Sequence, residues 1–138
     1  MELVEVVRTD KVSEETIRKA NDFARALGKT TIDAKDIPGF IVNFTLMPLL
    51  LHAARMVEEG IATKEDIDKG MRLGAGHPKG PIELLDLIGI DTALKVADTI
   101  CEAYPGKPQY EAPQIIRDLV AAGKLGKKSG EGFYSYRK

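Results

Sequence analysis

The stretch "DIPGFIVNFTLMPLLLHAARMVEEG", residues 36–60, decides how the rest of the chain is interpreted. From Phe40 onward it is dominated by apolar residues, and no glycine interrupts it before Gly60. This pattern predicts a long helix over residues 40–58, with apolar side chains on nearly every face. Because a helix that is apolar all round is normally buried all round, we expect it to lie at the centre of a mostly helical domain. Either one side of it meets a second subunit or a further domain, or it is buried entirely within its own domain.

Two residues of this predicted helix are unusual, the amide Asn43 in its first turns and Pro48 in its interior. An interior proline frees the carbonyl of the residue four positions earlier and bends the helix. Such a proline costs about 3 kcal/mol unless packing compensates, so we expect Pro48 to be fully buried. The amide of Asn43 could bond to neighbouring backbone or to a ligand, and the residues alone leave both alternatives open.

The composition fits one domain that lies in water. The chain has 138 residues, of which 43% are hydrophobic and 30% charged, with 20 basic against 21 acidic residues. This balance suggests neither a nucleic-acid partner nor a membrane-surface partner. The longest apolar run, residues 44–51, is far shorter than the roughly 20 residues of a membrane span. A single cysteine, Cys101, and a start without a signal-peptide pattern predict a cytoplasmic protein in which this thiol is buried and structural.

Residues 1–35 form a separate segment that is not purely helical. The alternating "ELVEVVR", residues 2–8, predicts a short strand, and "KTTIDA", residues 29–34, is a weak candidate for its partner. Between them, Ser13 is expected to cap a helix that ends before Gly28. We therefore divide the chain into residues 1–35, a strand–helix–strand segment, and residues 36–138, a helical domain.

The remainder of the chain carries the signals of further short helices. Their predicted first residues or caps are Thr63, the pair Gly80–Pro81, Asp91 or Thr92, and Pro113. The tail from Gly123 is rich in glycine and lysine and ends in aromatic residues. We interpret it as a loop whose Phe133, Tyr134 and Tyr136 dock onto the helices.

The chain contains no complete catalytic or cofactor-binding pattern. "GAGHPKG", residues 74–80, lacks the spacing and the preceding strand of a dinucleotide-binding loop. Neither His52 nor His77 has a cysteine or carboxylate at metal-ligand spacing, so we predict no metal site. The lysines of the tail, Lys124, Lys127 and Lys128, could face phosphates or simply form a solvated loop.

Four segments, in order and spanning essentially the whole chain, resemble one enzyme family. "DIPGFIVN", followed four residues later by proline, is similar to the start of the C-terminal domain of the L-3-hydroxyacyl-CoA dehydrogenases, including the 3-hydroxybutyryl-CoA dehydrogenases of bacteria. "EDIDKGMRLGAGHPKGPIELLDLIGID" resembles that domain's second characteristic region, and "GKLGKKSGEGFYSY" resembles its C-terminal end. "ELVEVVR" resembles the segment that joins it to the nucleotide-binding domain.

The resemblance implies a function that needs more than this chain. Members of the family have an N-terminal Rossmann domain that binds NAD and a helical C-terminal domain that completes the acyl-CoA site and forms a homodimer. They oxidise the 3-hydroxyl of an acyl-CoA to a ketone, with hydride passing to NAD⁺. The Rossmann domain and the family's catalytic histidine have no counterpart here, so we expect this chain alone to bind no cofactor and to be inactive.

Two site residues follow from the resemblance. The family's second catalytic residue, a glutamate, corresponds to Glu5, which would accept a hydrogen bond from the far nitrogen of the histidine and stabilise its protonated form. The family's substrate-side asparagine corresponds to Asn43, which would donate to the 3-oxygen of the substrate. The next residue departs from the family, since Phe44 stands where arginine is usual. The alternatives to this function are a stand-alone helical dimerisation or acyl-CoA-binding module, and a domain of a related dehydrogenase that acts on a hydroxy acid without CoA.

Overall fold

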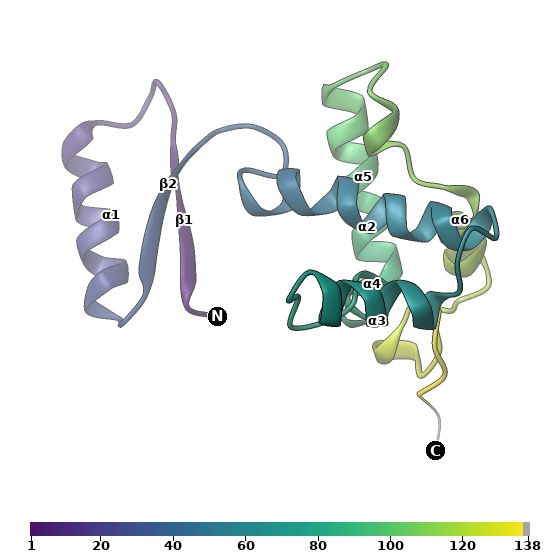
Figure 1. Ribbon diagram of the computed structural model, residues 1–138. Helices are drawn as coiled ribbons and strands as arrows, with labels where there is room; N and C mark the ends of the chain where they lie inside the picture. The colour runs from purple at the N-terminus through teal and green to yellow at the C-terminus, as the bar shows by residue number, and fades with distance from the viewer. Residues whose placement is uncertain (137–138) are drawn as a thin grey trace. The chain divides into compact units, whose positions relative to one another are not determined.

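The computed structural model describes residues 1–136, and the chain separates into two compact units, the first formed by Met1–Phe44 and the second beginning at Thr45. The first unit consists of β1 (Leu3–Arg8), α1 (Glu14–Ala26) and β2 (Thr30–Lys35). The second contains most of α2 (Val42–Glu58), then α3 (Lys64–Gly74), α4 (Pro81–Ile88), α5 (Ile90–Ala103) and α6 (Gln114–Ala121), with two 3₁₀ turns, η1 (Pro108–Tyr110) and η2 (Lys127–Ser129) (Figure 1). The prediction of a mostly helical chain with a small β segment at its front is confirmed.

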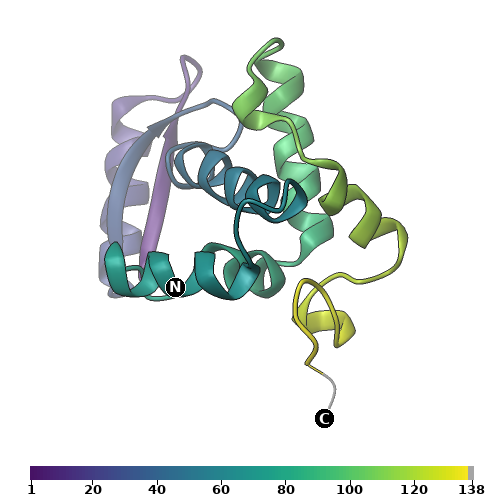
Figure 2. The same ribbon diagram turned by 45° about the vertical axis from the view of Figure 1, so that its right-hand side comes forward.

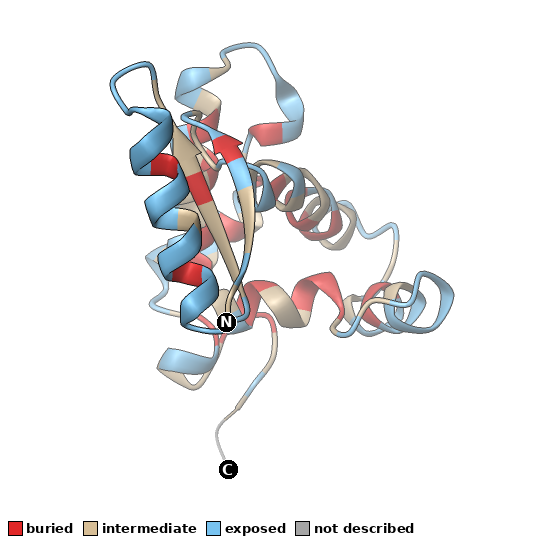
Figure 3. Cartoon of the chain, turned by 90° about the vertical axis from the view of Figure 1, so that its left-hand side faces the viewer, coloured by how far each residue is buried: buried red, intermediate tan, exposed pale blue. Residues whose placement is uncertain are grey.

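The first unit is a single β–α–β element. The strands β1 and β2 pair in parallel, with Glu5 opposite Ile32, so the weak strand candidate does pair with the first strand. The predicted cap is also confirmed, because the Ser13 hydroxyl accepts a hydrogen bond from the Thr16 amide at 3.2 Å. Only Ile17 and Ala24 of α1 are buried, and the rest of the helix is largely exposed (Figure 3). This unit therefore has a very small core.

The helix α2 differs from its prediction in two respects. It begins at Val42 rather than Phe40, because Gly39 and Phe40 both adopt positive φ, 85° and 45°, and turn the chain just before the helix. Within this chain, the apolar surface around the start of α2 is incompletely covered, since Ile41 and Val42 are 43% and 39% exposed. Pro48, inside the helix, is only half-buried.

The buried residues of α2 lie mainly along one side. They are Met47, Leu50, Leu51, Ala53 and Ala54, most of which follow the spacing of three or four residues that defines a helix face. The apolar surface of α2 is thus larger than the surface that this chain covers.

The helices from α3 to α6 pack in chain order. The helix α4 packs against both α3 and α5, and α5 packs against α6 (Figures 1 and 2). The C-terminal end of α2 meets the start of α6, where the Glu58 carboxylate accepts a hydrogen bond from the Ile115 amide at 2.6 Å. Side chains from all these helices form a closed core, among them Leu51, Leu85, Ile100 and Ile116.

Most helix starts of the second unit lie where the sequence predicts them. Thr63 caps α3, Pro81 is the first residue of α4, and Pro113 directly precedes α6. The prediction of Asp91 or Thr92 as the cap of α5 is wrong, because this helix begins at Ile90. Gly89, at φ 99°, turns the chain immediately after α4, and the fully buried Ile90 donates its amide to the Leu125 carbonyl at 3.2 Å.

Two buried carboxylates attach the tail to the helices. Asp86, fully buried in α4, accepts hydrogen bonds from the amides of Phe133 and Tyr134 and from the Tyr136 hydroxyl, at 2.8–2.9 Å. Asp68 of α3 accepts the Tyr134 hydroxyl at 2.8 Å. The docking of the three aromatic residues is therefore confirmed, and it depends on two aspartates whose role the sequence did not indicate.

Asp68 also holds the start of α4 in place. Asp68 accepts the amides of Ile82 and Glu83, at 2.8 and 2.9 Å, which are N–H groups that a helix start leaves without a partner. The backbone passes very close to both carboxylate-bearing residues, because a Cβ added at Gly80 would collide with the Asp68 side chain and one added at Gly126 with the Asp86 backbone. These glycines are required by close packing.

Cys101 is half-buried rather than buried, which corrects the prediction for this thiol. It lies on α5 two residues before the end of the helix. Within residues 1–136, no helix is both long enough and apolar enough to cross a membrane.

Candidate functional site

Glu5 lies in the middle of β1, on the face of the sheet that points away from α1. Asn21 of α1 donates to Asp33 at 3.4 Å, which shows that Asp33 and its partner Val6 face that helix. Because successive side chains of a strand point to opposite faces, Glu5 and its partner Ile32 face the other way. The side chain of Glu5 is half-buried on this second face.

One carboxylate oxygen of Glu5 binds the start of α2. Its Oε1 accepts hydrogen bonds from the amides of Ile41 and Val42, at 2.8 and 3.2 Å. These amides stand at the first residue of the helix and just before it, where an N–H group has no partner within the helix. Since the first turn of α2 has no acidic residue of its own, a glutamate from a distant strand supplies the negative charge that favours a helix N-terminus.

The turn that leads into α2 is unusual for its residue types. Gly39 accommodates φ 85° without cost, but Phe40 adopts φ 45°, a region that side chains with a Cβ rarely occupy. The turn is closed by hydrogen bonds from the Phe40 amide to the Ile37 carbonyl and from the Phe44 amide to the Gly39 carbonyl, each 3.0 Å. The backbone conformation of the residues just before Asn43 is thus fixed by these hydrogen bonds.

Asn43 directly follows Val42, one of the two residues that Glu5 holds. Its side chain is exposed, and no hydrogen bond joins its amide to another of residues 1–136. Phe44 beside it is half-buried. The two residues singled out by resemblance, Glu5 and Asn43, therefore belong to neighbouring parts of the first unit, linked through the backbone of Ile41 and Val42. Sequence reasoning did not predict this link, because no pattern couples two positions 36 or 37 residues apart.

An apolar groove of about 540 Å³ lies along β1 and α1. Its floor is formed by valines of β1, and its sides include Phe23 and Leu27, which are 69% and 60% exposed. Among the described residues, β1 pairs with β2 alone, so its other edge carries backbone groups without a strand partner. Together these features give the first unit a large uncovered apolar surface.

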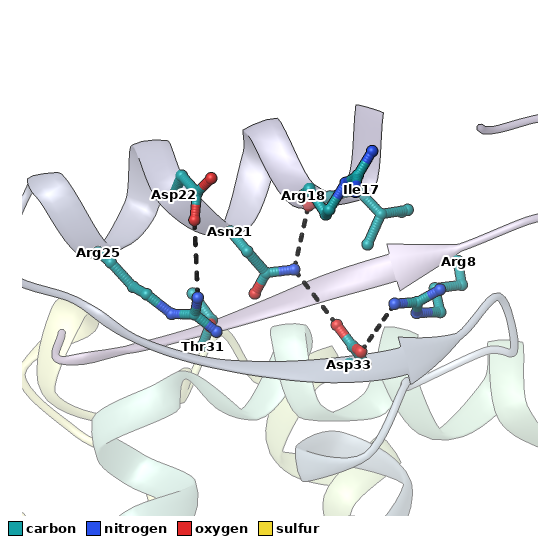
Figure 4. Close-up of a pocket in the computed structure, with 8 residues that line it drawn as sticks. All are labelled: Arg8, Ile17, Arg18, Asn21, Asp22, Arg25, Thr31 and Asp33. Carbon is teal, nitrogen blue, oxygen red and sulfur yellow. Dashed lines mark hydrogen bonds and ion pairs between the residues drawn. The ribbon is translucent and has the colours of Figure 1, made fainter. Parts of the chain in front are cut away.

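A second depression of the first unit is polar (Figure 4). Arg8 pairs there with Glu14 at 2.7 Å and with Asp33 at 3.1 Å, and these two carboxylates raise the pKa of its guanidinium. Arg25 lies 3.7 Å from Asp22. Two of the three arginines that line the depression are thus paired with neighbouring carboxylates.

The lysines of the tail are also paired. Lys124 lies 2.7 Å from Glu131, and Lys128 lies 2.5 Å from Asp91, whose carboxyl pKa is lowered by this ammonium group. Lys127 stacks over the Tyr136 ring at 5.3 Å. This pairing favours the interpretation as a structural loop over a phosphate-binding role.

Within the part of the chain that the structure describes, no three histidine, cysteine or acidic side chains gather as metal ligands. The chain also has no glycine in the turn between β1 and α1, residues 9–13, where a dinucleotide-binding loop would need one. This turn therefore does not carry the glycine pattern by which a dinucleotide-binding loop holds its pyrophosphate.

Comparison with known proteins gives a consistent result along the chain. Residues 39–136 match the family model described as 3-hydroxyacyl-CoA dehydrogenase, C-terminal domain, and residues 1–37 match the model of the NAD-binding domain of the same family. A probable 3-hydroxyacyl-CoA dehydrogenase of Caenorhabditis elegans is 52% identical over 138 residues, which are 100% of this chain and 46% of that protein. The mitochondrial hydroxyacyl-coenzyme A dehydrogenase of Mus musculus is 49% identical over 99% of this chain and 44% of its own length.

The solved structures agree with the sequence relatives. The crystal structure of M. tuberculosis FadB2 superposes with a TM-score of 0.96 at 46% identity, covering 99% of this chain and 48% of that one. The chain thus spans about half the length of the curated relatives that it matches.

Proposed function

Because the chain belongs to the 3-hydroxyacyl-CoA dehydrogenase family, we propose that it is the substrate-binding and dimerisation part of an NAD-dependent enzyme that oxidises L-3-hydroxyacyl-CoA to 3-oxoacyl-CoA. The observation that carries the proposal is that the segment with the family's glutamate and the segment with its asparagine meet at one point, where Glu5 binds the start of α2. Two residues that act at one substrate position must lie close together in space, even when they are far apart in sequence.

In this proposal, Glu5 acts on the histidine that removes the hydroxyl proton, and Asn43 acts on the hydroxyl oxygen itself. The Oε1 atom of Glu5 is occupied by α2, and its Oε2 carries no hydrogen bond from residues 1–136, so it can accept one from the histidine of the intact enzyme. That bond would fix the imidazole tautomer and stabilise the imidazolium formed when the base takes the hydroxyl proton. Asn43, exposed at the helix start, would donate its amide N–H to the substrate oxygen as it becomes a carbonyl.

The proposed partner of this chain is the remainder of the NAD-binding domain. Residues 1–37 match the model of that domain, and the unpaired edge of β1 and the apolar groove beside it are surfaces that a continuing sheet would cover. A homodimer would cover other apolar residues, for which the exposed Leu73 and Leu87 of the second unit are candidates. We retain the cytoplasm as the proposed location because an unpaired, half-buried thiol suits a reducing compartment.

The proposal is tested by joining this chain to the NAD-binding domain of a relative, by fusion or co-expression, and following NADH consumption with acetoacetyl-CoA. We expect activity from the combination and none from either part alone. Glu5→Ala should reduce it by about 10²-fold or more, the range found for general acid–base groups. A combination that binds NADH but does not reduce acetoacetyl-CoA would refute the proposed substrate. Undiminished activity of Glu5→Ala would refute the role of Glu5.

A further inference from the structure

Glu5 makes contacts that an orienting partner of a histidine does not need. A single hydrogen bond to an imidazole would use one carboxylate oxygen, yet the other oxygen, Oε1, receives two backbone amides at 2.8 and 3.2 Å. Both amides belong to the start of α2, and Asn43 is the next residue of that helix. The same side chain therefore touches the segment that presents the second site residue.

Apart from the hydrogen bonds of its own turn, the start of α2 has few contacts that hold it in position. The chain arrives through Gly39 and Phe40 at φ 85° and 45°, and a phenylalanine in this region persists only when its surroundings fix it. The side chains of Ile41, Val42 and Asn43 are all exposed, so packing contributes little there. The two hydrogen bonds to Glu5 connect this segment to the ordered sheet, where Glu5 sits opposite Ile32.

We propose that Glu5 is a positioning residue for Asn43, in that its Oε1 fixes the start of α2 and thereby the location of the Asn43 amide. The inference deepens the proposed function and rests on it for the identity of the substrate. Glu5 thus performs two tasks with its two oxygens: Oε1 anchors the helix start, and Oε2 faces the histidine. The two tasks can be separated by substitution, because they depend on different properties of the side chain.

The anchoring of α2 depends on the length of the Glu5 side chain, and the stabilisation of the histidine depends on its negative charge. In Glu5→Gln the side chain keeps its length and an oxygen that can accept both amides, but it loses the negative charge. In Glu5→Asp the charge remains, but the shorter side chain withdraws the carboxylate from amides that now lie at 2.8 and 3.2 Å. Glu2→Gln is the matched control, since Glu2 is exposed and its side chain has no hydrogen bond within residues 1–136.

The first measurement is amide hydrogen exchange of Ile41 and Val42 in this chain. We expect Glu5→Asp to accelerate their exchange by about tenfold, as the loss of a capping interaction does, and Glu5→Gln and Glu2→Gln to change it by less than about threefold. The amide of Ala24 in α1 should exchange as before in all three, which shows that the unit remains folded. Unchanged exchange of Ile41 and Val42 in Glu5→Asp overturns the inference, whatever reaction the intact enzyme catalyses.

The second measurement is a double-mutant cycle on the chain joined to an NAD-binding domain. Asn43→Ala should lower kcat by about 10²-fold in the parent and by a similar factor in the Glu5→Gln background, where the helix start stays anchored. In the Glu5→Asp background the same change should cost less than tenfold, because Asn43 is already misplaced. An equal loss in both backgrounds overturns the coupling. Absence of any reduction of acetoacetyl-CoA would instead refute the proposed function, while the exchange result would still decide the anchoring.

Discussion

The two units of the chain differ in how completely they bury their own apolar side chains. The second unit encloses a core of fully buried residues such as Leu50, Leu85 and Ile100, and even its buried carboxylate Asp86 has three hydrogen-bond donors. The first unit has two strands and one helix, leaves Phe23 69% exposed, and keeps one strand edge unpaired. The difference shows that the second unit buries most of its apolar core within itself, whereas the first leaves much of its apolar surface uncovered within this chain.

The largest expected effect comes from replacing a phenylalanine in each unit, Phe133 in the second and Phe23 in the first, and comparing the losses of stability. Phe133 is 8% exposed in the second unit, and its amide is bound by Asp86. Phe133→Ala should therefore lower the free energy of unfolding by about 3–5 kcal/mol, measured by urea denaturation with circular dichroism. Phe23→Ala should change it by less than about 0.5 kcal/mol, because that ring is mostly in water. Similar losses for both would mean that the first unit has a core of its own.

Glycines at positive φ give a second comparison. Gly126 adopts φ 94°, and a Cβ there would collide with the backbone of Asp86, which cannot move aside as a flexible side chain would. Gly28, at φ 72° in the first unit, faces open space. We expect Gly126→Ala to cost about 3 kcal/mol and Gly28→Ala about 1 kcal/mol, the second value being the conformational cost alone. Equal shifts in the urea midpoint would show that the close approach at Asp86 is not a constraint.

The features that could be predicted from the sequence are those fixed by neighbours in the chain. The caps Ser13 and Thr63 and the first-turn Pro81 depend on residues within three or four positions, and all were found where expected. The strand pair and the docking of the tail also followed from local patterns. The start of α5 did not, because Gly89 and the buried Ile90 are placed by contact with Leu125, far along the chain.

The candidate site was predictable only in its residue identities. Resemblance named Glu5 and Asn43, but it gave no sign that Glu5 binds the amides of Ile41 and Val42. The burial of Asp86 was missed for a related reason, since an acidic residue in the first turns of a helix is normally a solvated partner of the helix N-terminus. In both cases a carboxylate is held by backbone amides remote in sequence, and no periodicity records such a contact.

Alkaline pH should destabilise the second unit selectively, because Tyr134 and Tyr136 lie in it. Burial, and then the hydrogen bonds to Asp68 and Asp86, raise the pKa values of Tyr134 and Tyr136 above the ordinary value. Because the folded state holds these hydroxyl protons more tightly than the unfolded state does, the two tyrosines stabilise the fold below the unfolded-state pKa of about 10. This stabilisation is lost as pH rises further.

The variant Tyr136→Phe separates the contribution of this hydroxyl. It should cost about 1 kcal/mol near pH 8, where the hydrogen bond to Asp86 is lost, and it should show a shallower decline of stability above pH 10 than the parent. Hydrogen exchange resolved by segment should locate the decline in the tail and α4, with β1 and α1 unaffected. A parallel decline in both proteins would exclude Tyr136 as the titrating group.

The smallest expected effect concerns the ion pair of Asp91 and Lys128. It tests whether a surface ion pair contributes measurably to the stability of the second unit. The Lys128 ammonium lowers the pKa of the Asp91 carboxyl, so the pair stabilises the fold above the unfolded-state pKa of about 4 and this contribution disappears as pH falls through the folded-state value. Because both side chains are more than a third exposed, solvent screens the pair, and Asp91→Asn should cost less than about 1 kcal/mol at pH 7. Its urea midpoint should converge with that of the parent below pH 4.

The exposed pair of Arg8 and Glu14 in the first unit provides the control, since Glu14→Gln should be nearly neutral at both pH values. A loss at pH 7 as large as that of Gly126→Ala would mean that the ion pair between η2 and α5, and not Asp86 alone, holds the tail in place.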